Sequence, residues 1–203
     1  MPIRAIISDF GGVLVRTFDA SGRASWEDRL YLPRGSLPGL VFDSEVSMRA
    51  MRGQATEDEV WQDVARRFRL APEDLATLRH DFWRGDRLDE DLVRFFAGLR
   101  PRYRTAILSN AWNGVRQLFR RIGLDKAFDL IVISAEEGMV KPDPRIYRLT
   151  ASRLGVHPEE AVLIDDLPAN VVGARAAGMR AVHFRSPEQA IAELRAMLDD
   201  LSG

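Results

Sequence analysis

Five short apolar runs, separated by helical patterns, restrict the fold more than any other feature of the sequence. They are "IRAIISDF" (3–10), "RTAILSN" (104–110), "LIVIS" (130–134), "AVLIDD" (161–166) and "RAVHF" (180–184). Each run is rich in Ile, Val, Leu or Ala and does not alternate apolar with polar residues, which is typical of strands covered on both faces. Helical patterns lie between the later runs, for example at Val115, Leu118, Phe119 and Ile122. Strands alternating with helices predict an α/β protein with a Rossmann-like, doubly wound parallel sheet.

Residues 15–88 break this alternation, since they contain at least two helical patterns and no convincing strand. The segment "TEDE" (56–59) is a capping box before an apolar face that includes Trp61 and Phe68, and residues 71–83 repeat the helical pattern. Residues 16–39 are punctuated by Gly and Pro and are predicted to be rich in loops. We therefore expect a core of residues 1–14 and 89–203 with a helical insertion of residues 15–88.

Composition excludes several classes of function. The 203 residues suffice for one domain with a modest insertion. A net charge of −1, from 29 basic and 30 acidic residues, disfavours nucleic acid and anionic membranes as partners. The absence of cysteine excludes disulfides, thiolate nucleophiles and zinc–thiolate sites. The apolar N-terminus contains an acid and lacks a basic leader, and no run reaches transmembrane length, so we expect a cytoplasmic protein. As an oligomeric state, either a monomer or a homodimer is expected.

Polar residues follow the predicted strands at the points where the strands end. Asp9 closes the first run, Ser109 and Asn110 close the second, and Asp165 and Asp166 close the fourth. The carboxyl ends of parallel strands form the ligand-binding edge of such a sheet. Three carboxylates there repel one another unless cations are present, and Mg²⁺ favours such oxygen ligands. Lys141 follows the third run and adds a positive charge, and Ser109 with helix-start N–H groups suits a phosphate. The pattern predicts Mg²⁺ and a small-molecule phosphate at one edge.

Four segments in order carry a resemblance to a known family. "DFGGVL", "LSN", "KPDP" and "IDDLPAN" resemble the four motifs of the haloacid dehalogenase superfamily, and the inserted helices, with "MRGQATEDEVW", resemble its helical cap. The likeness covers nearly the whole chain. It implies a hydrolase with a Rossmann-like core.

The resemblance also implies roles for individual residues. Asp9 is expected to be the nucleophile, forming an aspartyl phosphate, and to bind Mg²⁺ together with the carbonyl of Gly11 and the carboxylate of Asp166. Asp165 is expected to support the metal through water or through another ligand. Lys141 is expected to bridge Asp9 and the charge that develops on the phosphoryl group.

Further residues complete the set that the resemblance implies. Ser109, the backbone of Asn110 and Gly12 are expected to hold phosphoryl oxygens, and Asn170 is a weakened counterpart of the second acid of the fourth motif. The loop after the first motif and the residue after the second motif are expected to face the substrate. This assigns possible specificity roles to Arg16, Asp19, Arg23 and Trp112.

Gly11 departs from the family's usual pattern, because most of its phosphatases carry there an Asp that acts as general acid and base. Such help is worth about 10² to 10⁴ in rate. Three alternatives stay open: substrates with good leaving groups; an acid recruited from the cap loop, where Asp19 is nearest, or reliance on ordered water; or lost activity. A branch of the family with this glycine includes sugar-phosphate phosphatases. The resemblance therefore favours a Mg²⁺-dependent phosphatase of small phosphomonoesters.

Two other classes of function compete with the phosphatase. One is a non-catalytic, phosphate-binding or ligand-binding regulatory module that has lost the acid. The other is a 2-haloacid dehalogenase, in which halide departs without a general acid. A dehalogenase needs no metal and would leave the repulsion between Asp165 and Asp166 unexplained.

Overall fold

The core of the molecule is a five-stranded parallel sheet. The computed structural model describes residues 1–199. In order across the sheet the strands are β5 (Leu130–Ile133), β4 (Arg104–Ser109), β1 (Ala5–Ser8), β6 (Ala161–Asp165) and β7 (Arg180–His183). All five apolar runs of the sequence are strands of this sheet. The α/β, Rossmann-like fold predicted from them is confirmed.

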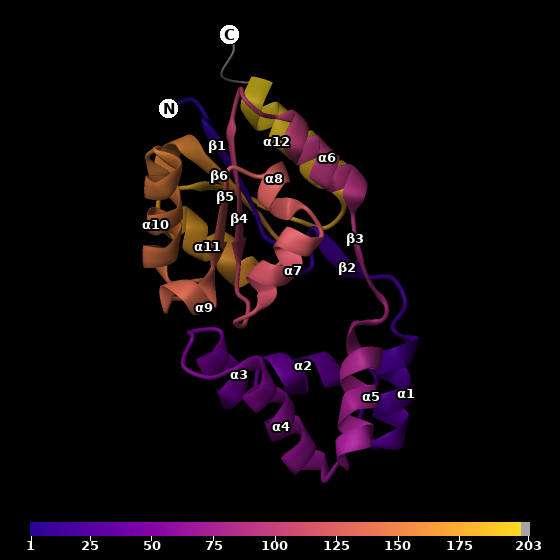
Figure 1. Cartoon of the computed structure of the whole chain (residues 1–203). Coiled ribbons are helices and arrows are strands. Elements are labelled where there is room, and N and C mark those ends of the chain that lie inside the picture. The colour runs from indigo at the N-terminus through magenta and orange to yellow at the C-terminus, as the bar shows by residue number, and fades with distance from the viewer. Residues whose placement is uncertain (200–203) are drawn as a thin grey trace.

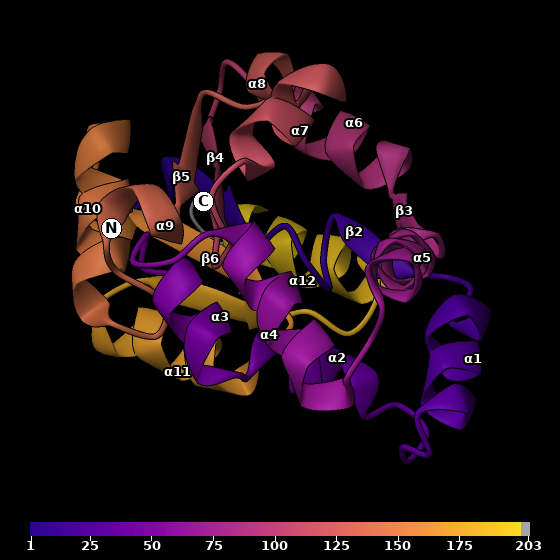
Figure 2. The ribbon, with the colours of Figure 1, turned by 60° about the horizontal axis from the view of Figure 1, so that its bottom comes forward.

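Successive residues of the strands face opposite layers of helices, which explains why the runs are apolar throughout. Ile6 belongs to the hydrophobic cluster on one face of the sheet, and Ile7 to the cluster on the other. The first face is covered by α6 (Glu90–Gly98), α7 (Val115–Arg121), α8 (Leu124–Ala127) and α12 (Pro187–Asp199). The second face is covered by α10 (Pro144–Leu154) and α11 (Pro168–Ala176). Short helices α9 (Ser134–Glu137) and η1 (Pro158–Glu160) connect strands to these layers (Figures 1 and 2).

Five helices between residues 21 and 83 lie together beyond one end of the sheet, and we call them the cap (Figure 1). They are α1 (Ser21–Arg29), α2 (Leu37–Phe42), α3 (Glu45–Ala50), α4 (Glu57–Phe68) and α5 (Pro72–Trp83). The predicted capping box of α4 is present, since the Thr56 hydroxyl accepts from Glu59 N–H and the Glu59 carboxylate from Thr56 N–H. The cap helices share a hydrophobic cluster of their own. The proposed boundaries of core and insertion stay a prediction.

Two features of residues 15–88 differ from expectation. Where no strand was predicted, β2 (Val15–Thr17) and β3 (Asp86–Leu88) pair antiparallel. Each has only three residues, too few for a periodic pattern, and together they form the two chain passages between core and cap. Helix α1 lies inside the segment predicted to be loop. Its sequence "SGRASWEDR" buries one large apolar side chain, Trp26, so no helical stripe marks it.

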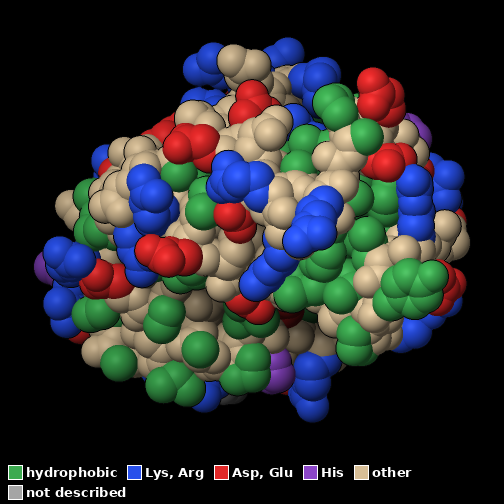
Figure 3. Space-filling model, turned by 90° about the horizontal axis from the view of Figure 1, so that it is seen from below, with side chains coloured by type: hydrophobic (Ala, Val, Ile, Leu, Met, Phe, Trp, Pro, Cys, Tyr) green, Lys and Arg blue, Asp and Glu red, His purple; other side chains and the backbone are tan. Residues whose placement is uncertain are grey.

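The surface seen from the cap side carries charges of both signs. Figure 3 shows basic and acidic side chains interspersed there, with hydrophobic side chains gathered between them. Among residues 1–199, no helix has the length and apolar character needed to cross a membrane.

Candidate active site

Three carboxylates meet at the carboxyl edge of the sheet. In the parallel register Ser8 of β1 pairs with Ile164 of β6, so the next residues, Asp9 and Asp165, extend side by side. One oxygen each of Asp9, Asp165 and Asp166 lies within 4.8 Å of the others. Asp9 is 7% exposed and Asp165 is fully buried. Strand register alone therefore brings together acids that are 156 residues apart in sequence.

Lys141 places its charge between two of these acids. Its Nζ lies 2.8 Å from Asp9 Oδ2 and 2.6 Å from Asp165 Oδ2, and donates to the carbonyl of Leu108 at 2.9 Å. Burial alone would lower the pKa of this lysine, but the carboxylates of Asp9 and Asp165 outweigh burial and raise it. Lys141 is thus a fixed positive charge.

One lysine does not balance three acids. The pKa of Asp9 is raised to about 7, because burial and the charge of Asp165 together outweigh the opposing effect of Lys141. The pKa of Asp166 is also raised, first by burial and then by Asp165. A divalent cation would relieve this repulsion and favour the ionised carboxylates.

The adjacent carboxylates of Asp165 and Asp166 differ in the hydrogen bonds that they already accept. The Asp165 carboxylate accepts from Lys141 Nζ, from Leu167 N–H at 2.9 Å and from Asn170 Nδ2 at 2.9 and 3.2 Å. Within residues 1–199, no other residue donates a hydrogen bond to the Asp166 carboxylate. Asp166 therefore has oxygen lone pairs available for a metal. Asn170 is committed to orienting Asp165.

The two glycines after Asp9 differ in the space around them. Gly12 adopts φ +75°, and a Cβ there would lie 2.1 Å from Asp166 Oδ2. Its N–H donates to the carbonyl of Val15 at 2.9 Å. The amide of Gly12 is thus already engaged, and the lack of a side chain admits the Asp166 carboxylate; the phosphate contact expected of Gly12 stays a prediction. A Cβ at Gly11 would meet nothing within 4 Å.

The end of β4 supplies a free hydroxyl and a brace for Lys141. Ser109 is 3% exposed, and its hydroxyl has no hydrogen-bond partner among the described residues. The Asn110 side chain accepts from Lys141 N–H at 2.8 Å and donates to the Lys141 carbonyl at 2.9 Å. The sequence assigned Asn110 only a backbone role. The side-chain role was missed because its partner is 31 residues away and no local pattern marks it.

The specificity roles expected of Arg16, Asp19, Arg23 and Trp112 stay predictions, and the structure shows other contacts for each. Arg16 pairs with Asp89 at 2.5 Å, and Arg23 pairs with Asp86 at 2.8 Å. Both pairs lie where β2 and β3 connect core and cap.

Asp19 accepts from Ser21, and these hydrogen bonds lower its pKa, so its carboxyl is ionised near neutrality. Trp112 is 6% exposed and belongs to the cap's hydrophobic cluster. The substrate contact expected of Trp112 stays a prediction.

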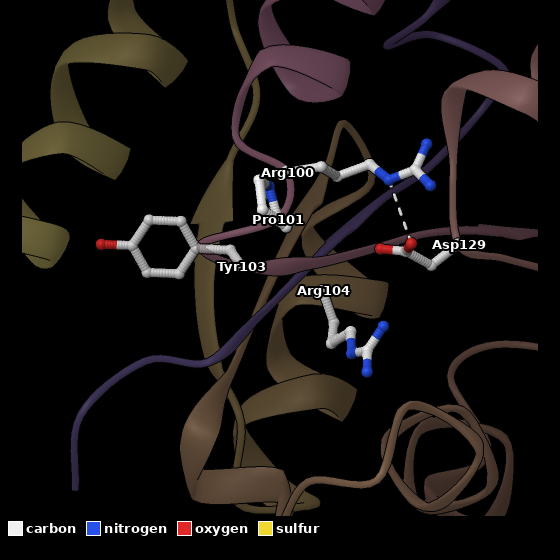
Figure 4. A pocket seen from close by; sticks show the side chains of 5 residues that line it. All are labelled: Arg100, Pro101, Tyr103, Arg104 and Asp129. Atoms are coloured by element: carbon white, nitrogen blue, oxygen red, sulfur yellow. Dashed lines mark ion pairs between the residues drawn. The ribbon is translucent and has the colours of Figure 1, made fainter.

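A separate hollow of about 320 Å³ lies at the other edge of the sheet (Figure 4). It is lined by Arg100, Pro101, Tyr103, Arg104 and Asp129, and Arg100 pairs with Asp129 at 3.0 Å. Arg104 begins β4 whereas Ser109 ends it. The hollow is therefore distinct from the carboxylate site.

Curated relatives of the chain include enzymes of several activities. It is 37% identical over 157 residues to the phosphoserine phosphatase of Thermus thermophilus, covering 73% of this chain and 60% of the relative. It is 29% identical over 215 residues to acyl-CoA dehydrogenase family member 10 of Mus musculus, covering 96% of this chain and 19% of the relative. The chain thus spans less than two thirds of the length of these relatives.

Solved structures share the fold over nearly the whole chain. An enzyme of the haloacid dehalogenase (HAD) family from Bacteroides thetaiotaomicron was crystallised with magnesium and inorganic phosphate. It superposes with a TM-score of 0.73 at 17% identity, over 90% of this chain and 94% of that one. The L-2-haloacid dehalogenase of Xanthobacter autotrophicus, with chloropropionic acid covalently bound, superposes with a TM-score of 0.64 at 26% identity, over 96% and 83%. A family model described as haloacid dehalogenase-like hydrolase matches residues 3–178. With most of the chain matched and the carboxylate site at the sheet edge, the protein belongs to the haloacid dehalogenase-like hydrolases.

Proposed function

We propose that the chain is a Mg²⁺-dependent phosphatase of small phosphomonoesters with good leaving groups, working through an aspartyl phosphate at Asp9. The observation that carries the proposal is the buried group of Asp9, Asp165 and Asp166, with Lys141 Nζ contacting two of the three. Such a group holds too much negative charge for one lysine and calls for a further cation.

The donor set fits Mg²⁺. Asp9 and Asp166 would hold the ion with the carbonyl of Gly11, since the Asp166 carboxylate is not engaged by another described residue and all three acids offer an oxygen within 4.8 Å. When bound, the ion would neutralise the carboxylates and phosphate oxygens. Asp165 would remain with Lys141 and Asn170.

The chain's own residues account for the two chemical steps. A carboxylate oxygen of Asp9 attacks phosphorus while the bond from phosphorus to the leaving oxygen breaks. Lys141 Nζ, fixed beside that carboxylate, and the free Ser109 hydroxyl stabilise the phosphoryl oxygens. Water then attacks phosphorus, breaking its bond to Asp9 and releasing inorganic phosphate and a proton.

The leaving group must depart with little protonation by the protein. Gly11 offers no acid, and the nearest alternative in sequence, Asp19, has a lowered pKa because of its hydrogen bonds from Ser21. An ionised carboxylate donates no proton. This favours anomeric sugar phosphates or acyl phosphates, whose leaving groups tolerate negative charge. The cap, proposed as residues 15–88, would select among them.

Similarity supports a phosphatase over a dehalogenase without deciding it. One curated relative is a phosphoserine phosphatase, and one structural neighbour was crystallised with magnesium and phosphate. The dehalogenase neighbour keeps that chemistry open. Displacement of halide would give no role to the strained pair Asp165 and Asp166.

The decisive experiment is phosphate release across a phosphomonoester panel with Mg²⁺ or chelator. We expect Mg²⁺-dependent release that falls at least about 10³-fold in Asp9→Asn, which removes the nucleophile. Asp91→Asn, at an acid whose side chain is 91% exposed, is the matched control and should retain full activity. Chelator-insensitive halide release would identify a dehalogenase. Phosphate binding without turnover would identify a binding module.

A further inference from the structure

The four residues after Ser109, Asn110 to Asn113, bridge the phosphate site and the cap, and we call them the 110–113 loop. Its first half is held by the core. The Asn110 side chain brackets the Lys141 backbone. The buried Ser134 hydroxyl accepts from Ala111 N–H at 3.0 Å and lies 3.2 Å from the Ala111 carbonyl, to which it donates. The loop's position in the core is thus set by Ser134 and by the backbone of Lys141, whose Nζ contacts the carboxylates.

The second half of the loop is held by the cap. Trp112 donates its Nε1–H to the hydroxyl of Ser47 in α3 at 3.0 Å. The Asn113 side-chain oxygen accepts from the N–H of Glu57, the first residue of α4, at 3.0 Å. That N–H is one of the helix-start donors that have no partner within the helix. The core therefore supplies part of the N-terminal capping of a cap helix.

Apolar contacts reinforce these two hydrogen bonds. The indole of Trp112 lies with ring centroids 5.5 Å from Phe42, 6.3 Å from Trp61 and 6.3 Å from Trp83. The turn after α3 also abuts the core, because a Cβ at Gly53 would lie 2.3 Å from the Ala135 carbonyl. In Figures 1 and 2, α3 lies beside α9 accordingly. Moving the cap away would expose one of the largest apolar side chains of the cluster.

We propose that Trp112 is a positioning residue that couples docking of the cap to the geometry of the phosphate-binding residues Ser109 and Asn110. Trp112 is buried in the cap and does not reach the carboxylates, so it acts through the loop. With Trp112 seated, the loop backbone is held from both sides. With Trp112 released, the cap holds the loop only through the hydrogen bond between Asn113 and Glu57 N–H. The role in phosphate binding rests on the proposed function.

The test compares Trp112→Phe and Ser47→Ala, which remove the two ends of one hydrogen bond, with Trp26→Phe. Trp26 belongs to the same cluster and donates its Nε1–H to Asp81 at 3.0 Å, but both partners lie in the cap. Trp26→Phe therefore measures the effect of losing an indole hydrogen bond that lies within the cap and does not join the cap to the core.

Two measurements separate coupling from simple loss of stability. We expect the dissociation constant of inorganic phosphate, measured by calorimetry with Mg²⁺, to rise about fivefold in Trp112→Phe and Ser47→Ala, the factor that one neutral hydrogen bond contributes. Hydrogen exchange should rise in residues 109–113 of both variants. Trp26→Phe should leave both quantities unchanged, and the double variant should lose no more than either single one.

The outcomes are distinct from those of the proposed function. A wild-type protein that binds phosphate without turnover overturns the phosphatase and leaves this test intact. Unchanged exchange in residues 109–113 in Trp112→Phe, or equal weakening of phosphate binding by Trp26→Phe, overturns the coupling. Absence of phosphate binding in the wild type overturns both.

Discussion

At the scale of one residue, the proposed function makes Gly11 the position that limits which phosphates can be hydrolysed. A side chain there would meet nothing within 4 Å, and Gly11 is not among the glycines with positive φ. We expect Gly11→Asp to fold normally and to supply the missing acid. Turnover of an alkyl phosphate should rise by up to about 10²-fold, whereas turnover of p-nitrophenyl phosphate, which needs no acid, should change little. The ratio of the two kcat/KM values measures the effect.

Gly12 is the control position for that experiment. A Cβ there would collide with Asp166 Oδ2, and the backbone has φ +75°. Gly12→Ala should displace Asp166 and weaken Mg²⁺ binding by about tenfold or more, the scale on which a displaced ligand acts. If Gly11→Asp impaired Mg²⁺ binding as Gly12→Ala does, the proposed room for an acid at position 11 would be refuted.

The raised pKa of Asp9 leads us to expect that the affinity for Mg²⁺ depends on pH. Its pKa is raised from 3.8 to about 7, chiefly by burial, so the metal-free protein holds a proton there below about pH 7. Mg²⁺ must displace that proton, and we expect its dissociation constant to fall about tenfold per pH unit up to about pH 7 and then level off. Calorimetry across that range measures the slope, which Asp9→Asn should abolish.

The raised pKa of Asp9 also makes the stability of the fold depend on pH. A carboxyl whose folded pKa is raised favours the fold fully below 3.8 and loses that contribution as the pH rises to about 7. Mg²⁺ should therefore raise the melting temperature most at and above pH 7.

At the scale of elements, Asp89 joins helix α6 to strand β2. It caps α6 by accepting from Leu92 N–H at 2.8 Å, and it pairs with Arg16 at 2.5 Å. Asp89→Ala removes the N-cap hydrogen bond of α6, which contributes about 1 kcal/mol to stability. It also leaves the half-buried guanidinium without its partner, which costs about 1–2 kcal/mol. We expect the free energy of unfolding, measured with urea, to fall by about 2–3 kcal/mol. The exposed neighbour Glu90→Ala should cost less than about 0.5 kcal/mol.

The same pair gives the loss a pH dependence. Burial acts to raise the pKa of Asp89, but hydrogen bonds from Arg16 and Leu92 N–H outweigh it and lower the value below 3.8. The stabilisation is therefore present above 3.8 and disappears as the pH falls through the lowered pKa. The difference between wild type and Asp89→Ala should shrink below about pH 4, and a difference that persisted there would contradict the ion pair.

At the scale of the whole molecule, the sheet could be predicted because strands buried on both faces are apolar throughout their length. Runs such as "AVLI" (161–164) carry no polar position, and the acid Asp165 appears at the last residue of the strand. The meeting of Asp9 and Asp165 follows from parallel strands ending at one edge. The four motif segments, which follow one another in the family's order, also indicated the family. These signals are local, so a single chain reveals them.

What escaped prediction depends on contacts between distant residues. Strands β2 and β3 are too short to show a period, and α1 buries only one large apolar side chain. Trp112 meets Ser47 across 65 positions, so nothing near either residue marks the contact. The difference between Asp165 and Asp166 depends on which hydrogen-bond donors surround each carboxylate, and this depends on packing.

The central place of β1 has a consequence for the order of assembly during synthesis. This strand is made first, yet its neighbours β4 and β6 end at Ser109 and Asp165, so Asp9 waits for most of the chain before it gains its surroundings. Helices α1 to α5 contact one another within residues 21–83 and can pack much earlier. We therefore expect the nascent chain to be able to complete the cap before the carboxylate site exists, so that Trp112 docks onto a cap that is already formed.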